Sequence, residues 1–399
     1  MTATSDLYFS NEAIEQMGPA LKAPNTHLEF YLERGVSPVH QDISDLARHL
    51  DRRRSLYRSL GVLPKLIEGA RVLEVAPGSG HNSIFIASCK PQQFTMVEPN
   101  PVAVREIEEL YGQLDIEHTT PDVVQARLED FTPDHPFDLV ICEGWLGSAA
   151  HEQTMLTKLG GFVCQGGVLC VSLVSPIGLL ANTLRRILAV RLCPDGAMEE
   201  RLAPLLAAFG PHLATLADMS RPHEDWIVDN MINPAWYGVC LTPAMTVKAL
   251  EPSFDHFGFS PKFICDWRWY KSLYGGQRRF NSVFLESFYS AAHNLLDYRE
   301  IKNSAHPDHA REIEAASTDL LEAAMSFEYN NGSESELLAA LARIQAAVQP
   351  VSPNAGAAVA ETIAAFSKPA ITPADVAGMT ALAPFFGREM MYASYTKER

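Results

Sequence analysis

One stretch, residues 71–87, constrains the fold of this chain more than any other. An apolar, β-branched-rich run ends at Pro77, and a second apolar run starts at Ile84, after a turn that contains Gly78 and Gly80. This order predicts a strand, a glycine turn and a helix. Glycines allow positive φ and a close approach of the backbone to a ligand, and the helix directs free N–H groups at the turn. The stretch predicts a nucleotide-binding turn without specifying the nucleotide.

Length and charge narrow the class of protein. A chain of 399 residues is long enough for two or three domains, or for one α/β domain with large additions. With 47% hydrophobic and 20% charged residues, disorder is excluded as the main state. The formal net charge of −16 disfavours general nucleic-acid binding, because clustered Lys and Arg drive phosphate binding. The compact basic run is limited to Arg52–Arg54. We therefore expect no nucleic-acid partner.

The cysteines and the N-terminal residues bear on localisation. Seven scattered cysteines, without a C-x-x-C pair, indicate reduced core thiols, and we expect a cytoplasmic protein without a metal site. The first residues lack a basic region followed by an apolar one, so we expect no secretory signal. The longest apolar stretch, near residues 167–174, is too short to span a bilayer, so we expect no membrane partner.

From residue 70 onward, strand patterns alternate with helix patterns, which predicts a parallel sheet with helices on its faces. The predicted strands are Arg71–Val75, Gln93–Val97, Val123–Leu128, Phe137–Cys142 and Val168–Val174, with two closing strands at Phe263–Trp267 and Ser282–Phe288. Acidic residues recur at the C-terminal ends of the first four strands, at Glu74, Glu98, Glu129 and Glu143. Ligands of open α/β sheets bind at that edge.

Helical patterns flank the predicted sheet. Residues 1–68 are expected to form a helical lid, in which the charged run at 52–54 is either a solvated helix face or a source of an Arg that reaches a carboxylate. Residues 69–175 are the nucleotide-binding core. Residues 176–290 combine a helical insertion, an aromatic region and the closing strands. Residues 291–399 are Ala-rich and predict a helical extension, which serves as a cap or as the contact of a possible homodimer.

The motif itself restricts the choice of nucleotide. A dinucleotide fingerprint needs a third glycine where this chain has Ser83, and no G-x-x-x-x-G-K-[ST] run is present. Glu98 lies eighteen positions after Gly80, at the end of the next predicted strand. A carboxylate at that place can accept hydrogen bonds from both hydroxyls of a ribose.

Residues 70–175 resemble the core of the class I S-adenosylmethionine-dependent methyltransferases. The resemblance is carried by the glycine turn, Glu98, Glu129 and the run that begins Phe137-Asp138, in the expected order. It implies a Rossmann-like, doubly wound, mostly parallel seven-stranded sheet with S-adenosylmethionine as cofactor. The family usually has glycine where this chain has Ala76.

The resemblance also implies roles for individual residues. It places Glu74, Ala76, Gly78, Gly80 and Asn82 around the methionine part of the cofactor, Glu98 on the ribose, Leu128 and Glu129 beside the adenine, and Glu143, Gly144 and Trp145 beside the transferable methyl group.

Methyl transfer is an in-line displacement, so the protein aligns the reactants and supplies a base only if the nucleophile carries a proton. The candidate bases are Glu143, at the end of the fourth predicted strand, and His223, Glu224 and Asp225, in the inserted segment. Glu143 and Glu152, on either side of Trp145, also resemble the paired-glutamate loop of protein arginine methyltransferases, and two carboxylates suit a guanidinium. Guanidino methylation is thus one alternative, and a non-catalytic cofactor-binding protein is another.

The aromatic region between residues 223 and 270 is the predicted acceptor site. Five rings are predicted to wall an apolar pocket, with His223, Asn230 and Asn233 as polar anchors. The rings are Trp226, Trp236, Tyr237, Trp267 and Trp269. Several of them are alternatively core residues, and we expect roughly half to be so. The predicted acceptor is a small molecule methylated on oxygen or nitrogen.

Overall fold

The structure is a computed structural model. It describes residues 27–37, 40–144, 152–194, 196–216, 219, 221–237, 240–264, 266–275, 278–303 and 305–398.

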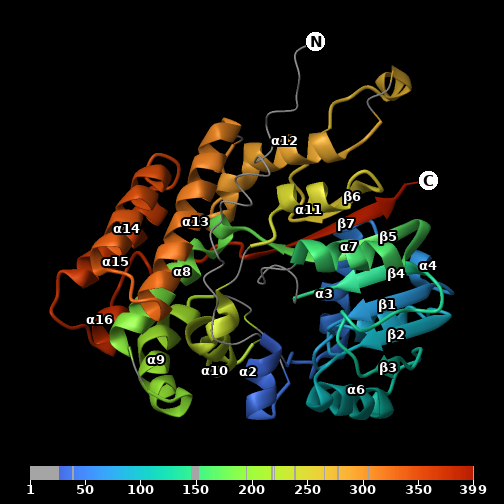
Figure 1. Cartoon of the computed structure of the whole chain (residues 1–399), viewed down its shortest axis with the longest axis horizontal. Helices are drawn as coiled ribbons and strands as arrows, with labels where there is room; N and C mark the ends of the chain where they lie inside the picture. The colour runs from blue at the N-terminus through green and yellow to red at the C-terminus, as the bar shows by residue number, and fades with distance from the viewer. Residues whose placement is uncertain are drawn as a thin grey trace.

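A seven-stranded sheet organises the molecule (Figure 1). Its strands are β1 (Arg71–Val75), β2 (Gln93–Val97), β3 (Asp122–Val124), β4 (Phe137–Cys142), β5 (Val163–Val174), β6 (Phe254–Ser260) and β7 (Met390–Lys397). Their order in the sheet is β3-β2-β1-β4-β5-β7-β6. β1 to β5 pair in parallel, and β7 runs antiparallel to both of its neighbours. The expected Rossmann-like, mostly parallel seven-stranded sheet is confirmed.

Alternation along each strand gives the sheet two apolar faces. In β1, Val72 packs into one core cluster, whereas Leu73 and Val75 pack into the other. The cluster of Val72 is completed by residues of α3 (Leu46–Ser59), α4 (Pro64–Ile67), α5 (Ile84–Ser88) and α6 (Pro101–Gln113). The opposite cluster is completed by residues of α7 (Glu152–Phe162), α8 (Pro176–Leu192), α11 (Pro243–Leu250) and α12 (Asn281–Ala291), among others. Helices on both faces make the fold doubly wound.

The other helices add to this core. α2 (His27–Arg34) precedes α3, and the region after α8 contains α9 (Met198–Leu213), α10 (His223–Ile227), η2 (Val228–Ile232) and η3 (Pro234–Trp236). The segment between β6 and β7 contains η4 (Tyr270–Gly275), η5 (Ala292–Leu295), α13 (Pro307–Tyr329), α14 (Glu334–Val348), α15 (Pro353–Phe366) and α16 (Pro373–Ala377). Helices α8, α9 and α13 to α16 form a lobe beside the sheet (Figure 1). No helix among the described residues is long and apolar enough to cross a membrane.

Both predicted closing strands are wrong. Residues 282–288 belong to α12, where buried Phe284, Leu285, Phe288 and Tyr289 recur at helical spacing. The described part of 263–267 forms neither strand nor helix. The strands that close the sheet are instead β6 and β7, which residues 261–389 separate along the chain.

Two further expectations are corrected by the sheet. The predicted strand at 123–128 ends at Val124, because its only partner β2 ends at Val97, which pairs with Val124. The expected helical extension, residues 291–399, is not helical throughout, because it contains β7, which lies between β5 and β6 in the sheet.

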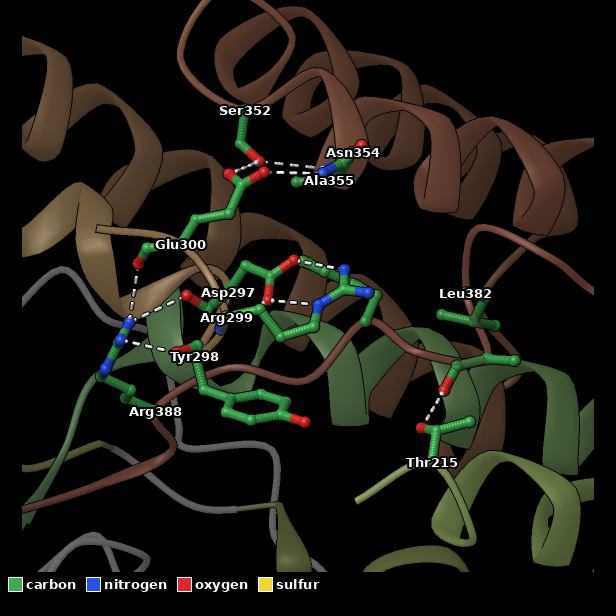
Figure 2. A network of polar contacts seen from close by, with 12 residues as sticks. Thr215, Asp297, Tyr298, Arg299, Glu300, Ser352, Asn354, Ala355, Leu382 and Arg388 are labelled. Carbon is green, nitrogen blue, oxygen red and sulfur yellow. Dashed lines mark hydrogen bonds and ion pairs between the residues drawn. The ribbon is translucent and has the colours of Figure 1, made fainter. Parts of the chain in front are cut away.

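Two arginines fix the segment that leads into β7. Arg185 of α8 is fully buried, and it donates to the carbonyl oxygens of Leu382 and Phe385, both at 2.9 Å. Arg388 donates to the carbonyl oxygens of Asp297 at 2.8 Å and Tyr298 at 2.7 Å, as Figure 2 shows. Buried carbonyl groups need such donors, so these contacts determine where β7 begins.

Helix α3 is held against the glycine turn. The ring of Tyr57 stacks on Phe85 of α5 with 5.3 Å between the centroids, and both rings are buried. His49 forms a 2.9 Å hydrogen bond with the carbonyl oxygen of His81, in the turn itself. These contacts place α3 beside the carboxyl ends of β1 and β4, where Arg53 and Tyr57 of this helix reach Glu143.

Candidate functional site

The glycine turn follows β1 at the carboxyl edge of the sheet. Ala76, Gly78 and Gly80 all have positive φ, of 55°, 59° and 76°. A Cβ on Gly80 would lie 2.9 Å from Cγ1 of Ile107 in α6, so the turn packs closely on that helix. An alanine with positive φ is strained, which gives a physical reason for the glycine that related turns have in place of Ala76.

Glu98, after β2, ties the turn to the neighbouring strand. Its Oε2 accepts from the backbone N–H of Gly78 at 3.0 Å, and its Oε1 accepts from the backbone N–H of Asn100 at 2.9 Å. Burial raises the pKa of Glu98 to about 7, although both N–H groups oppose this shift. A carboxylate offers about four lone-pair sites, so two remain for ribose hydroxyls. The residues present fit the ribose of S-adenosylmethionine.

Glu143, which follows β4, lies in a buried ion pair. Nη2 of Arg53 donates to its Oε2 at 2.6 Å, and the hydroxyl of Tyr57 donates to its Oε1 at 2.6 Å. The side chains of Arg53 and Glu143 are 5% and 9% exposed. Of the two interpretations of the basic run at 52–54, the structure therefore supports an arginine that reaches a carboxylate.

Glu74 lies next to this pair on β1 and is buried. Its Oε2 has no hydrogen-bond partner among the described residues. Burial, and secondarily the charge of Glu143, raises the pKa of Glu74 to about 8. A carboxyl group in such surroundings keeps its proton at neutral pH.

This pKa predicts how stability depends on pH. Because the folded-state pKa of Glu74 exceeds its unfolded value, the folded protein binds more protons than the unfolded chain between about pH 4.5 and pH 8. The contribution of the Glu74 carboxyl to stability is fully present below about pH 4.5 and is lost as pH rises to about 8. We expect Glu74→Gln to remove a loss of stability on the order of 4 kcal/mol across this window. Urea unfolding of both proteins across this window measures the difference, and parallel curves would contradict the prediction.

A cavity opens beside the Arg53–Glu143 pair. Its volume is about 310 Å³, and it is lined by Gln41, Arg52, Arg53, Leu56, Asn82 and Tyr392. Helix α3, the glycine turn and β7 thus meet at one space. Asn82 was predicted for the cofactor site from the sequence, whereas Tyr392 was not, because β7 was not expected to be a strand.

The other predicted cofactor residues differ in burial, and some lie outside the described residues. Leu128 is buried and Glu129 is exposed, in the segment after β3. Gly144 has a φ of 77° and donates its N–H to Oγ of Ser172 at 2.9 Å. Trp145 and the side chain of Glu152 lie outside the described residues, so their predicted roles stay predictions.

The aromatic region divides into buried and exposed rings. Trp226 and Tyr237 are buried in the core between the inserted helices, and Trp236 is half-buried. Trp267 and Trp269 are 90% and 61% exposed. The predicted pocket walled by all five rings is therefore wrong, because the two groups of rings occupy different environments.

Two of the predicted polar anchors, Asn230 and His223, have different surroundings. The Oδ1 of Asn230 accepts from Nε1 of Trp236 and from Nδ2 of Asn182, both at 3.2 Å. Asn182 also donates to the carboxylate of Glu389, the residue before β7. His223 is half-buried at the start of α10, and no contact among the described residues joins it to Glu143. The sequence did not point to Glu389, since it precedes a strand that was missed.

Comparison with known proteins adds to this geometry. The chain is 36% identical over 89 residues to the ribosomal RNA small subunit methyltransferase G of Pectobacterium atrosepticum, over 22% of this chain and 42% of that protein. It is 30% identical over 114 residues to the same-named protein of Methylococcus capsulatus, over 28% and 54%. The chain thus spans about half the length of the curated relatives it matches.

A solved structure, PKMT2 from Rickettsia typhi in complex with AdoHcy, matches over 59% of this chain and 48% of its own, at 16% identity and a TM-score of 0.40. No family model matches the chain.

The names of the curated relatives correct the expected partners. Those proteins are named for ribosomal RNA, which conflicts with the expectation of a small-molecule acceptor and no nucleic acid. The expectation came from the overall charge, which says nothing about how cations are distributed locally.

The strand order, the turn held by Glu98 and the sequence relatives all agree. The chain carries the nucleotide-binding core of the class I S-adenosylmethionine-dependent methyltransferases, and S-adenosylmethionine is the cofactor of that core.

Proposed function

We propose that this protein transfers the methyl group of S-adenosylmethionine to an oxygen or nitrogen acceptor. The observation that carries the proposal is Glu98, whose two oxygens hold the backbone of Gly78 and Asn100 at the carboxyl edge of the sheet. When bound, the cofactor supplies an electrophilic methyl carbon on a sulfonium. The protein then has to bind, orient and shield the reactants.

The chain's own residues supply these functions in the proposal. Glu98 accepts the ribose hydroxyls, and the positive-φ turn lets the backbone approach the methionine part. The Arg53–Glu143 pair and Tyr57 keep a fixed carboxylate at the end of β4 and exclude water from it.

The arrangement around Glu143 disfavours guanidino methylation. In that alternative, Glu143 and Glu152 hold the guanidinium of the acceptor. Glu143 already pairs with the guanidinium of Arg53, accepts from the hydroxyl of Tyr57 and is 9% exposed, so little of its carboxylate is open to a second guanidinium. The same burial weakens Glu143 as a general base, since a base has to lie within hydrogen-bond reach of the acceptor proton.

In the proposal, the acceptor group occupies the cavity beside the Arg53–Glu143 pair. Its volume of about 310 Å³ accommodates one planar ring. A nucleobase in RNA reaches such a site only when it is unpaired or turned out of its stack. Both a free small acceptor and a single base of a larger RNA satisfy this limit.

The test combines cofactor binding with transfer. Calorimetry with S-adenosylhomocysteine measures binding, and labelled S-adenosylmethionine measures transfer to small-subunit ribosomal RNA and to a panel of small oxygen and nitrogen nucleophiles. Transfer to either set supports the proposal. Tight binding without transfer to either would support the alternative of a non-catalytic cofactor-binding protein, and absence of binding would contradict both.

Glu98→Gln is expected to raise the Kd for S-adenosylhomocysteine at least tenfold. A glutamine presents an NH2 group to one of the two backbone N–H groups that the carboxylate accepts, and hydrogen bonds to charged groups contribute about 1.5–3 kcal/mol. Calorimetry measures the change. Glu68→Gln is the matched control, because Glu68 forms only an exposed ion pair with Lys65. Equal affinities of the two variants would contradict the role of Glu98.

A further inference from the structure

The segment between β6 and α12 differs in charge from the rest of the chain. Residues 262–280, called the aromatic arm here, contain five Lys or Arg and one acidic residue, within a protein whose net charge is −16. The cations are Lys262, Arg268, Lys271, Arg278 and Arg279, and the acidic residue is Asp266. In Figure 1 the arm extends beyond the body of the molecule at the upper right, immediately before α12.

Large aromatic rings of the arm face solvent. Trp267 is 90% exposed, Tyr270 is 62% exposed, Trp269 is 61% exposed and Phe280 is 39% exposed. Trp226, in the core of the same molecule, is 6% exposed. Scattered single apolar residues on a surface need no explanation, but four exposed rings within fourteen residues form a patch, and such patches mark binding sites.

The cations of the arm lie among these rings. Lys271 lies over the ring of Trp269, with Nζ 4.8 Å from the centroid, and the guanidinium of Arg268 lies 4.7 Å from the centroid of Phe280. Neither Lys262 nor Lys271 forms a hydrogen bond or ion pair with any residue that the structure describes, and both are exposed. Their charges remain available to an anionic partner.

Backbone contacts hold the base of the arm. Nη1 of Arg279 donates to the carbonyl oxygen of Phe254 at 3.1 Å, and Nη1 of Arg268 donates to the carbonyl oxygen of Arg279 at 2.9 Å. Asp255 accepts from the backbone N–H of Phe280 at 2.8 Å. The rings are thus presented from a base that is anchored to β6.

We propose that the aromatic arm binds unpaired RNA. Exposed rings stack on bases, each of which has a π face, while neighbouring lysines contact the phosphates that follow. Lys262 and Lys271 lie on either side of Trp267, Trp269 and Tyr270 in the chain, whereas Arg268 is already paired with Asp266. Duplex RNA does not offer free base faces, so single-stranded segments are the ligand.

The composition of the arm favours RNA over a lipid surface. Interfacial membrane segments expose aliphatic side chains as well as aromatic ones. In the arm, the exposed large hydrophobic residues are all aromatic, whereas Ile264 and Leu273 are partly buried. The inference goes beyond the proposed methyl transfer, because it concerns docking of RNA at a surface with its own ligand and its own test.

The test measures binding of a fluorescein-labelled single-stranded RNA oligonucleotide to the full chain by anisotropy. Replacing Trp267 and Trp269 together by Ala is expected to weaken binding roughly tenfold or more, because each base that stacks on a ring contributes about that factor. Trp267→Tyr, which keeps a ring, is expected to retain most of the affinity. Leu66→Ala, at another exposed apolar residue, is the control and should leave affinity unchanged.

Charge is tested separately from stacking. Lys262→Gln with Lys271→Gln is expected to reduce the slope of log K against log salt by roughly 1.4, since each phosphate contact contributes about 0.7 for single strands. Unchanged RNA affinity in the double Trp variant would overturn the proposal. So would equal affinity for a duplex of the same sequence, or binding to phosphatidylglycerol vesicles but not to RNA.

Binding of S-adenosylhomocysteine is measured on the same variants. It should not change, so a failure of the arm proposal is distinguishable from a failure of the proposed methyl transfer.

Discussion

Arg53→Met is expected to lower the free energy of unfolding by about 3–5 kcal/mol, because it leaves the carboxylate of Glu143 buried without its counter-charge. The side chains of the pair are 5% and 9% exposed and the two groups are 2.6 Å apart, so solvent and salt screen their attraction only weakly. Methionine keeps most of the packing volume, which restricts the change mainly to charge. We also expect cofactor affinity to fall, because α3 contacts the glycine turn through His49. Urea unfolding and calorimetry measure the two effects.

The neighbouring residue provides a matched control. Arg54 forms an ion pair with Asp51 at the same distance of 2.6 Å, but its side chains are 58% and 70% exposed. Arg54→Met should cost no more than about 1 kcal/mol, because exposed pairs contribute little. The double variant Arg53→Met with Glu143→Gln should recover part of the stability lost in Arg53→Met. A similar cost for Arg53→Met and Arg54→Met would show that the buried pair is not important for stability.

Gly178→Ala is expected to destabilise the protein by about 3 kcal/mol, at the upper end of overpacking substitutions. Gly178 lies in the first turn of α8, and a Cβ there would lie 2.2 Å from the carbonyl oxygen of Arg388. The atom it meets belongs to the backbone, which Arg388 itself anchors through Asp297 and Tyr298. Either α8 or the segment before β7 would have to move, and Glu389 and Tyr392 would move with it.

Thermal and urea unfolding measure this effect against a second helical glycine. A Cβ on Gly210 of α9 meets nothing within 4 Å. Gly210→Ala should therefore stabilise the helix by up to about 1 kcal/mol, because alanine has the higher helix propensity. Opposite signs for the two substitutions are expected. A neutral Gly178→Ala would mean that the contact between α8 and residues 387–389 is loose.

The sequence predicted the part of the fold that is local. Strands β1, β2 and β4 were predicted with the bounds that the structure has, because each is a short apolar run followed by a turn. Closing the sheet depends on contacts distant in sequence, and it was predicted wrongly. Residues 282–288 contain enough aromatic side chains to resemble a strand, but their burial follows helical spacing.

In the candidate site, too, residues close in sequence were predicted, whereas residues brought together from distant parts of the chain were not. The positions of Glu98 and the glycine turn followed from one motif within thirty residues, and the structure joins them by hydrogen bonds. Tyr392 reaches the cavity from β7, more than three hundred residues from Asn82, and no spacing rule relates the two. The basic character of the arm was overlooked for a different reason. A count of adjacent cations found Arg52–Arg54, whereas cations spread among aromatic rings do not form a run.

The position of β7 has a consequence for how the chain acquires its structure during synthesis. β6 pairs with β7 alone, so it has no strand partner until residues 390–397 have left the ribosome. During that interval β5 and β6 both expose unpaired edges, and an unpaired edge can pair with another nascent chain. Once the chain has folded, the contacts of Arg185 and Arg388 hold the segment that leads β7 into the gap between β5 and β6.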